Sequence, residues 1–192
     1  AARRRVCGIT PGKPLASKNY DPFTITPQRG LDAIPGSDLL IVAATLPRPD
    51  TEYPPEALAA LRAAHAEGAT VLSLCSGSFV LGAAGLLDGR RCTTHWMYAE
   101  EMQRRFPAAV VDPKVLFVED NGIVTSAGTA AGIDASLHVV RRELGAAVAT
   151  RIARRMVVPP QRDGGQLQYV ETPIPACSAD SLSPILEWAV VN

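Results

Sequence analysis

The chain has 192 residues, the size of one ordinary domain with room for a short extension. Hydrophobic residues make up 47% of the sequence and aromatic residues only 5%, which predicts a core of small aliphatic side chains, as in helices packed closely on a parallel sheet. The 19 basic and 19 acidic residues balance, which excludes nucleic-acid binding driven by net charge alone.

Targeting and metal signals are missing from the sequence. No apolar run reaches the roughly 18 residues of a membrane span, and the basic N-terminus is not followed by the apolar stretch of a signal peptide. The cysteines show neither Cys-x-x-Cys pairs nor the Cys/His spacing of a metal site (Cys7, Cys75, Cys92 and Cys177). We therefore expect a reduced, cytoplasmic protein without membrane contact, metal or cofactor.

The first half of the chain predicts four strands, one helix and a long loop. Arg3–Ile9 is expected to form a strand, followed by a proline-broken loop with a short strand at Phe23–Thr26. The continuous apolar run Asp38–Ala44 predicts a strand covered on both faces. Pro54–Glu67 predicts a helix with prolines in its first turn, and Val71–Leu74 predicts the next strand.

The second half continues the alternation of strands and helices. The expected elements are a strand at Arg91–Thr94, a helix at Glu100–Phe106, a hairpin of 115–118 and 123–125 with an Asn-Gly turn, and helices at 133–144 and 148–156. This order predicts an α/β domain of three layers, in which helices cover both faces of a doubly wound, mostly parallel sheet. A small β-hairpin is expected in addition.

A cysteine follows the strand at Val71–Leu74, at the sharp turn into a predicted helix. Such a turn presents Cys75 at the carboxyl edge of the sheet, and a helix N-terminus there favours the thiolate. The backbone N–H groups of Ser76 and Gly77 are then candidates for an anion pocket, which would suit an oxyanion or a ligand carboxylate equally well. The alternative is a small buried residue in a tight turn.

His95 follows the short strand at Arg91–Thr94, 20 residues after Cys75. In a parallel sheet successive strand ends meet at one edge, so the imidazole could lie within hydrogen-bond reach of the sulfur and form an ion pair with it. The alternative is a packed histidine beside Trp96.

The small residues Ser126–Gly132 lie between a predicted strand and a predicted helix. They would let a ligand approach the backbone near Gly128 and Thr129, with a helix N-terminus favouring a negative group. Close packing of helix on sheet explains the same pattern. Asp134 is expected in the first helical turn, where the helix dipole alone accounts for it.

Three stretches together resemble the ThiJ/PfpI superfamily of amidotransferase-like domains. They are CSGSFVLGAAGLLDGRRCTTHW (75–96), VTSAGTAAGIDASLHVVRRELG (124–145) and ARRMVVPPQRDGGQLQY (153–169). The third stretch is most similar to the sensor domain of AraC-type, GlxA-like transcriptional regulators. The resemblance implies a flavodoxin-like, amidotransferase-like fold.

The resemblance also implies a domain organisation. Residues 1–158 would form the amidotransferase-like domain, 159–182 an extended linker, and 183–192 the start of a linker helix toward a DNA-binding domain that this chain does not contain. The chain is expected to start at the family's second strand, so the acidic residue that usually faces the cysteine is absent.

The resemblance implies a sensor more than an enzyme. A small, nitrogenous metabolite would bind beside Cys75, Ser76, Gly77, His95, Gly128 and Thr129, bias the arrangement of a homodimer, and act on DNA only through the further domain. One alternative is a cysteine hydrolase or hydratase, such as an isocyanide hydratase, with Cys75 as nucleophile and His95 moving protons. Another is a scaffold that mainly dimerises.

Overall fold

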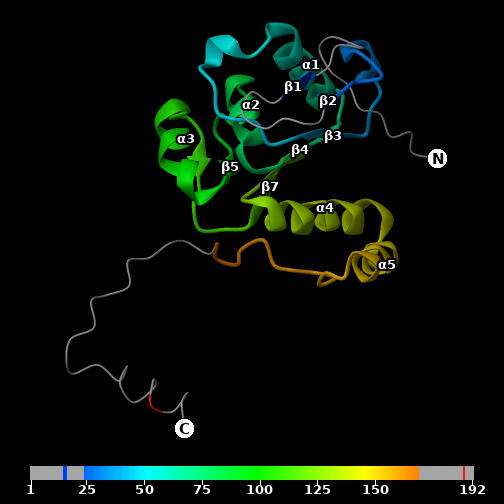
Figure 1. Cartoon of the computed structure of the whole chain (residues 1–192). Helices are drawn as coiled ribbons and strands as arrows, with labels where there is room; N and C mark the ends of the chain where they lie inside the picture. Colours follow the sequence, from blue (N-terminus) through cyan, green and yellow to red (C-terminus); the bar gives the residue numbers. More distant parts are fainter. Residues whose placement is uncertain (1–14, 17–23, 169–187, 189–192) are drawn as a thin grey trace.

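A computed structural model describes residues 15–16, 24–168 and 188 of the chain (Figure 1). Its central sheet has four strands in the order β3 (Leu39–Val42), β4 (Thr70–Ser73), β8 (Ile123–Ser126) and β7 (Phe117–Asp120). The first three strands are parallel, and β7 runs antiparallel to β8. The expected strand at Arg3–Ile9 and, apart from Trp188, the helix expected from 183 lie outside the described residues.

Helices cover both faces of this sheet (Figure 1). One face carries α1 (Pro55–Ala66), α2 (Ser78–Ala83) and α3 (Ala99–Arg105), and the other carries α4 (Thr129–Leu144), against which α5 (Ala146–Met156) packs. The shorter elements are β1 (Leu15–Ala16), β2 (Thr24–Ile25), β5 (Arg91–Cys92), β6 (Val110–Val111), and 3-10 turns at Leu31–Ala33, Asp50–Glu52, Cys75–Gly77 and Trp96–Tyr98. The expected three-layer, mostly parallel α/β fold is confirmed.

The two faces of β4 supply two separate parts of the core. Val71 joins a cluster built around Phe79 and Met102 on the side of α1 to α3. Its neighbour Leu72 points the other way and joins a cluster with Val124 and the α4 residues Ala131, Ala135 and Val139. Because consecutive residues of a strand point to opposite faces, the run Val71-Leu72 fills both parts of the core.

The strand β3 differs from the expectation that both its faces are covered. Leu40 and Val42 pack against the cluster on the α1 side, but Leu39 is 39% and Ile41 is 54% exposed. The physical reason is position: in the described sheet β3 pairs only with β4, and no described helix lies over the face that carries Leu39 and Ile41. A continuous apolar run therefore marks an edge strand here.

The predicted hairpin is present, with its first strand shifted two residues along the chain. Asn121 and Gly122 join β7 to β8 with φ angles of 49° and 78°. Both angles are positive, as a type I′ turn requires, and Asn-Gly is the pair that tolerates them best. Among the described residues no helix combines the length and apolar character of a membrane span.

Candidate active-site cysteine and its cavity

Cys75 stands at the apex of a sharp turn between β4 and α2. Its φ angle is 52°, in the left-handed region that residues with a side chain rarely adopt. The backbone carbonyl of Cys75 accepts hydrogen bonds from the hydroxyl groups of Ser78 (3.0 Å) and Thr94 (3.2 Å). Such strain persists only where neighbouring contacts hold it, and it concentrates at functional sites. The predicted order of strand, turn and helix around Cys75 is present, and we call its apex the elbow.

Ser76 and Gly77 lie behind the apex, and both are buried. The Ser76 hydroxyl donates to the carbonyl of Thr45 at 2.5 Å, and the Gly77 N–H donates to the carbonyl of Leu74 at 2.9 Å. A Cβ atom on Gly77 would lie 2.6 Å from the carbonyl oxygen of Val42. The turn itself therefore uses the Gly77 N–H, so of the two amides predicted to hold an anion only that of Ser76 stays a candidate.

Cys75 is partly exposed and lines a cavity of about 440 Å³. We call this the elbow cavity. It lies between the carboxyl ends of β3 and β4, the start and middle of α4, and one face of α5. Its wall consists of Ala44, Leu74, Cys75, Gly128, Thr129, Gly132, Ile133, Ser136, Leu137, Val140, Ile152 and Met156. Of the predicted ligand-binding residues, Cys75, Gly128 and Thr129 are in this wall.

His95 is not in the wall of this cavity but packs against Gly128, which is. A Cβ atom added to Gly128 would be 3.0 Å from Cδ2 of the His95 ring, so the imidazole packs directly against this glycine. The Nδ1 atom accepts a hydrogen bond from the Met97 N–H at 3.3 Å and so caps a 3-10 turn. Among the described interactions none joins His95 to the Cys75 sulfur, and the predicted ion pair stays a prediction.

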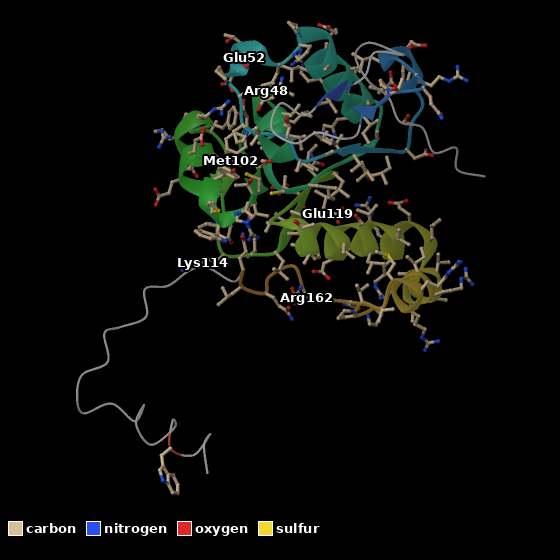
Figure 2. All side chains as sticks on the ribbon, viewed as in Figure 1. Arg48, Glu52, Met102, Lys114, Glu119 and Arg162 are labelled. Atoms are coloured by element: carbon tan, nitrogen blue, oxygen red, sulfur yellow. The ribbon has the colours of Figure 1, made fainter. Side chains whose placement is uncertain are left out.

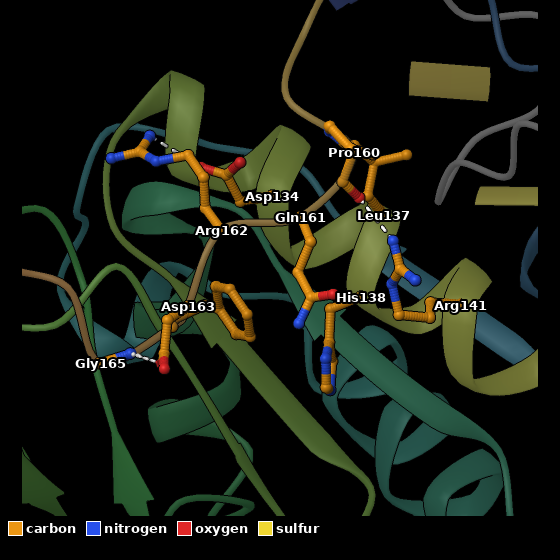
Figure 3. A pocket seen from close by; sticks show the side chains of 11 residues that line it. Asp134, Leu137, His138, Arg141, Pro160, Gln161, Arg162, Asp163 and Gly165 are labelled. Carbon is orange, nitrogen blue, oxygen red and sulfur yellow. Dashed lines mark hydrogen bonds and ion pairs between the residues drawn. The ribbon is translucent and has the colours of Figure 1, made fainter. Parts of the chain in front are cut away.

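A second cavity, of about 340 Å³, lies on the neighbouring face of α4 (Figure 3). Residues 160–165 of the chain form one wall, and Asp134, Leu137, His138 and Arg141 of α4 form another. The Arg141 guanidinium donates to the Pro160 carbonyl at 2.8 Å. Figure 2 shows Arg162 on this segment, which runs along α4.

The sequence predicts Asp134 in the first turn of its helix, and this prediction is wrong. The helix starts at Thr129, so Asp134 is in the second turn, and its side chain is only 6% exposed. The guanidinium of Arg162 lies 3.0 Å from its carboxylate. Burial raises the pKa of Asp134, and the positive charge of Arg162 opposes that shift. An ion pair rather than the helix dipole accounts for this residue.

Gln168 is buried near His95, although no sequence pattern marks it as a site residue. It is 9% exposed, and its side-chain amide bonds to residues on either side of His95. The stretch quoted for the family resemblance contains it, but a lone glutamine carries no signal of its own. Among the described residues no group of three or more His, Cys, Asp or Glu side chains is placed to hold a metal ion.

The model of the DJ-1/PfpI family matches residues 31–142, which include the elbow, His95 and most of α4. The chain belongs to the DJ-1/PfpI family. A curated member similar to it is the HTH-type transcriptional regulator GbdR of Pseudomonas aeruginosa, 32% identical over 139 residues, which are 71% of this chain and 37% of GbdR. The isonitrile hydratase of Pseudomonas putida is 37% identical over 100 residues, 52% of this chain and 42% of the enzyme.

A solved structure similar to this chain is that of an AraC family transcriptional regulator from Pseudomonas putida. It shares 26% sequence identity with this chain at a TM-score of 0.61, covering 70% of this chain and 71% of that one. The chain spans less than half the length of the two curated relatives. The resemblance drawn from the sequence is thus confirmed for the family and for its similarity to AraC-like regulators.

Proposed function

We propose that this chain is the ligand-sensing part of a bacterial AraC-family transcriptional regulator and that it binds a small metabolite in the elbow cavity. Its similarity to GbdR and to the AraC family regulator of Pseudomonas putida supports the regulatory role. The proposal takes residues 1–158 as the sensor, 159–182 as a linker and 183–192 as the start of a helix toward a DNA-binding domain. It places the protein in the cytosol as a homodimer.

The composition of the wall around Cys75 is the observation that favours ligand binding over catalysis. The described wall of the elbow cavity contains no carboxylate and no imidazole. A nucleophilic thiol normally needs a base within hydrogen-bond reach, and none of the described interactions joins this thiol to His95, whose Nδ1 atom accepts from the Met97 N–H. A thiol without such a partner is suited to contact a ligand rather than to attack it.

The same wall indicates the class of ligand. Leu74, Ile133, Val140, Ile152 and Met156 make it mainly apolar. Its polar groups are the Cys75 thiol and two hydroxyls, those of Thr129 and Ser136. Because no charged side chain is present in the described wall, a fully charged ligand would lose hydration without a partner. We propose a nitrogenous metabolite with a neutral, amide-like head group and a short apolar body.

A cysteine hydratase is the second candidate. The strained φ angle of Cys75 and the similarity to the isonitrile hydratase of Pseudomonas putida favour it. In this reading the thiolate would attack the substrate carbon, and water would later release the product. The base must then come from His95 after a movement of its turn, or from a residue outside the described part of the chain.

A thermal-shift screen with small neutral amides tests the sensing proposal. A ligand present at 100 times its Kd stabilises the folded state by about 2.7 kcal/mol. Val140→Phe, which fills part of the elbow cavity, and Cys75→Ala should each reduce or abolish this shift. Leu144→Phe is the matched control, because Leu144 is on the same helix but 63% exposed. If the ligand raises the melting temperature of both cavity variants as much as that of the wild type, the ligand does not bind in the elbow cavity.

Turnover separates the two candidates. The wild-type protein is incubated with an aliphatic isonitrile, and formation of the N-substituted formamide is followed by chromatography. The sensing proposal expects no turnover above a Cys75→Ala control. Steady turnover that Cys75→Ala abolishes would support the hydratase.

A further inference from the structure

Gln168 holds both residues that flank His95. Its Nε2 atom donates to the carbonyl of Thr94 at 3.1 Å, and its Oε1 atom accepts from the N–H of Trp96 at 3.0 Å. The same Nε2 atom donates to the carbonyl of Val115 at 2.9 Å. A buried side-chain amide whose donors and acceptor are all engaged has one low-energy orientation. The position of the His95 turn therefore depends on where Gln168 is.

Two hydrogen bonds connect this amide with the elbow. Thr94 accepts from Gln168 through its carbonyl, and its hydroxyl donates to the carbonyl of Cys75 at 3.2 Å. The next residue, His95, packs against Gly128 in the wall of the elbow cavity. A displacement of Gln168 would thus reach Cys75 through Thr94 and the cavity wall through His95.

Gln168 also ends the described part of the segment 160–168, which has further anchors besides the contact of Pro160 with Arg141. The Gly164 carbonyl accepts from the N–H of Leu116 at 2.7 Å, and Arg162 pairs with Asp134 of α4 (Figure 3). The backbone N–H of Gln168 donates to the carbonyl of Lys114 at 2.7 Å. The last of these anchors is therefore the one that touches the His95 turn.

We propose that Gln168 is a positioning residue for the elbow site and makes the state of that site and the attachment of segment 160–168 depend on each other. The inference rests on the proposed sensing role, to which it adds the route of regulation. A change at Cys75 alters the turn at residues 94–96 and so weakens or strengthens the hydrogen bonds of this turn with Gln168. By linkage, any change in the attachment of the segment alters the elbow by the same free energy.

Alkylation of Cys75 by iodoacetamide is the first test, with the labelled peptide quantified by mass spectrometry between pH 6 and 9. Gln168→Met keeps the side-chain volume but removes the hydrogen bonds. We expect Cys75 to be alkylated faster by a factor on the order of three or more, with a displaced pH profile, because the turn at its carbonyl is released. Gln161→Met is the matched control, since Gln161 is an exposed glutamine of the same segment.

The buried Cys92 reports on general unfolding in the same samples. A rise in the labelling of Cys92 equal to that of Cys75 would mean that Gln168→Met only destabilises the fold, and the proposal would be wrong. An unchanged rate and pH profile at Cys75 in a folded variant would equally overturn it.

The reverse direction needs no variant at position 168. N-ethylmaleimide is attached to Cys75 of the wild-type chain, and hydrogen exchange is measured in peptides that cover 113–118 and 160–168. We expect a change in exchange of about threefold or more at the amides of Leu116 and Gln168, which hold the segment. Cys75→Ser treated in the same way controls for labelling at other cysteines. Equal exchange before and after modification of Cys75 would contradict the coupling.

These readouts involve no metabolite. If no metabolite binds but alkylation and exchange respond as expected, the coupling holds and the proposed sensing function fails. If a metabolite binds in the elbow cavity but both readouts are unresponsive, the proposed function holds and the role of Gln168 is refuted.

Discussion

The guanidinium of Arg162 lies 3.0 Å from the carboxylate of Asp134 and joins positions 28 residues apart in the sequence. Asp134 is buried in α4, whereas Arg162 is partly exposed at the rim of the second cavity. Because a buried carboxylate without a counter-charge is costly, this pair fastens segment 160–168 to the helix that also walls the elbow cavity.

Removal of Arg162 should destabilise the domain in a pH-dependent way. Burial raises the pKa of Asp134 above the unfolded value of 3.8, and Arg162 limits that rise. In Arg162→Gln the folded-state pKa rises further, so the folded protein holds the proton more tightly. The deficit in unfolding free energy should be small below pH 3.8 and grow to about 2 kcal/mol at pH 7.

Urea denaturation at several pH values between 3.5 and 7 measures this deficit. Arg154→Gln, at an exposed position of α5, is the control and should change stability by less than about 0.5 kcal/mol. A deficit for Arg162→Gln that is constant across the pH range would show that the carboxylate of Asp134 does not carry the effect.

Gly77→Ala should prevent correct formation of the elbow. The added methyl group would lie 2.6 Å from the carbonyl oxygen of Val42 and 2.8 Å from that of Ala43, and neither backbone atom can move without distorting β3. We expect a loss of about 3 kcal/mol or more, or failure to fold. In Gly165→Ala the nearest atom is a side-chain oxygen of Asp163 at 3.3 Å, which can rotate away, so circular dichroism melts should show a clearly smaller loss.

Cys75 and Cys92 should differ sharply in reactivity. Burial, and secondarily the charge of Asp120, raise the pKa of Cys92 to about 12. At pH 8 only about one molecule in ten thousand then carries the Cys92 thiolate, which is the reactive form. Peptide mapping after brief iodoacetamide treatment should find Cys75 labelled and Cys92 unlabelled until urea is added. Comparable labelling of both in native buffer would contradict this assignment.

Phe79→Ala should cost about 3–5 kcal/mol of unfolding free energy. The ring is fully buried, lies edge-on to Phe106 and Tyr98, and receives the guanidinium of Arg105 at 5.0 Å from its centroid. Met97→Ala, at a 63% exposed position nearby, should be nearly neutral. Equal losses in thermal melts of the two variants would place the centre of the core elsewhere.

Local patterns were sufficient to predict most of the fold. The Asn121-Gly122 turn, the apolar run before Cys75 and the prolines at the start of α1 each specify a backbone conformation through nearby residues alone. The same kind of pattern predicts the turn at Cys75, because its positive φ belongs to a short strand–turn–helix unit. Interactions between residues close together in the sequence determine these features, so the sequence is sufficient to predict them.

The missed features depend on partners far away in the chain. Asp134 is predicted in the first turn because the apolar spacing begins at 133, whereas the helix begins at Thr129, and nothing near Asp134 predicts its partner Arg162. Gln168 carries no signal because its partners are Thr94, Trp96 and Val115. Periodicity also cannot tell a central strand from an edge strand, so the exposure of Ile41 was not foreseen. Tertiary contacts, rather than local preference, decide each of these cases.

Leu137 contributes to the walls of both cavities. A change in the size of this one side chain therefore alters both spaces at once. A substitution that makes room for a bulkier molecule in one compartment enlarges the other as well, so the two spaces on α4 are not independent in size.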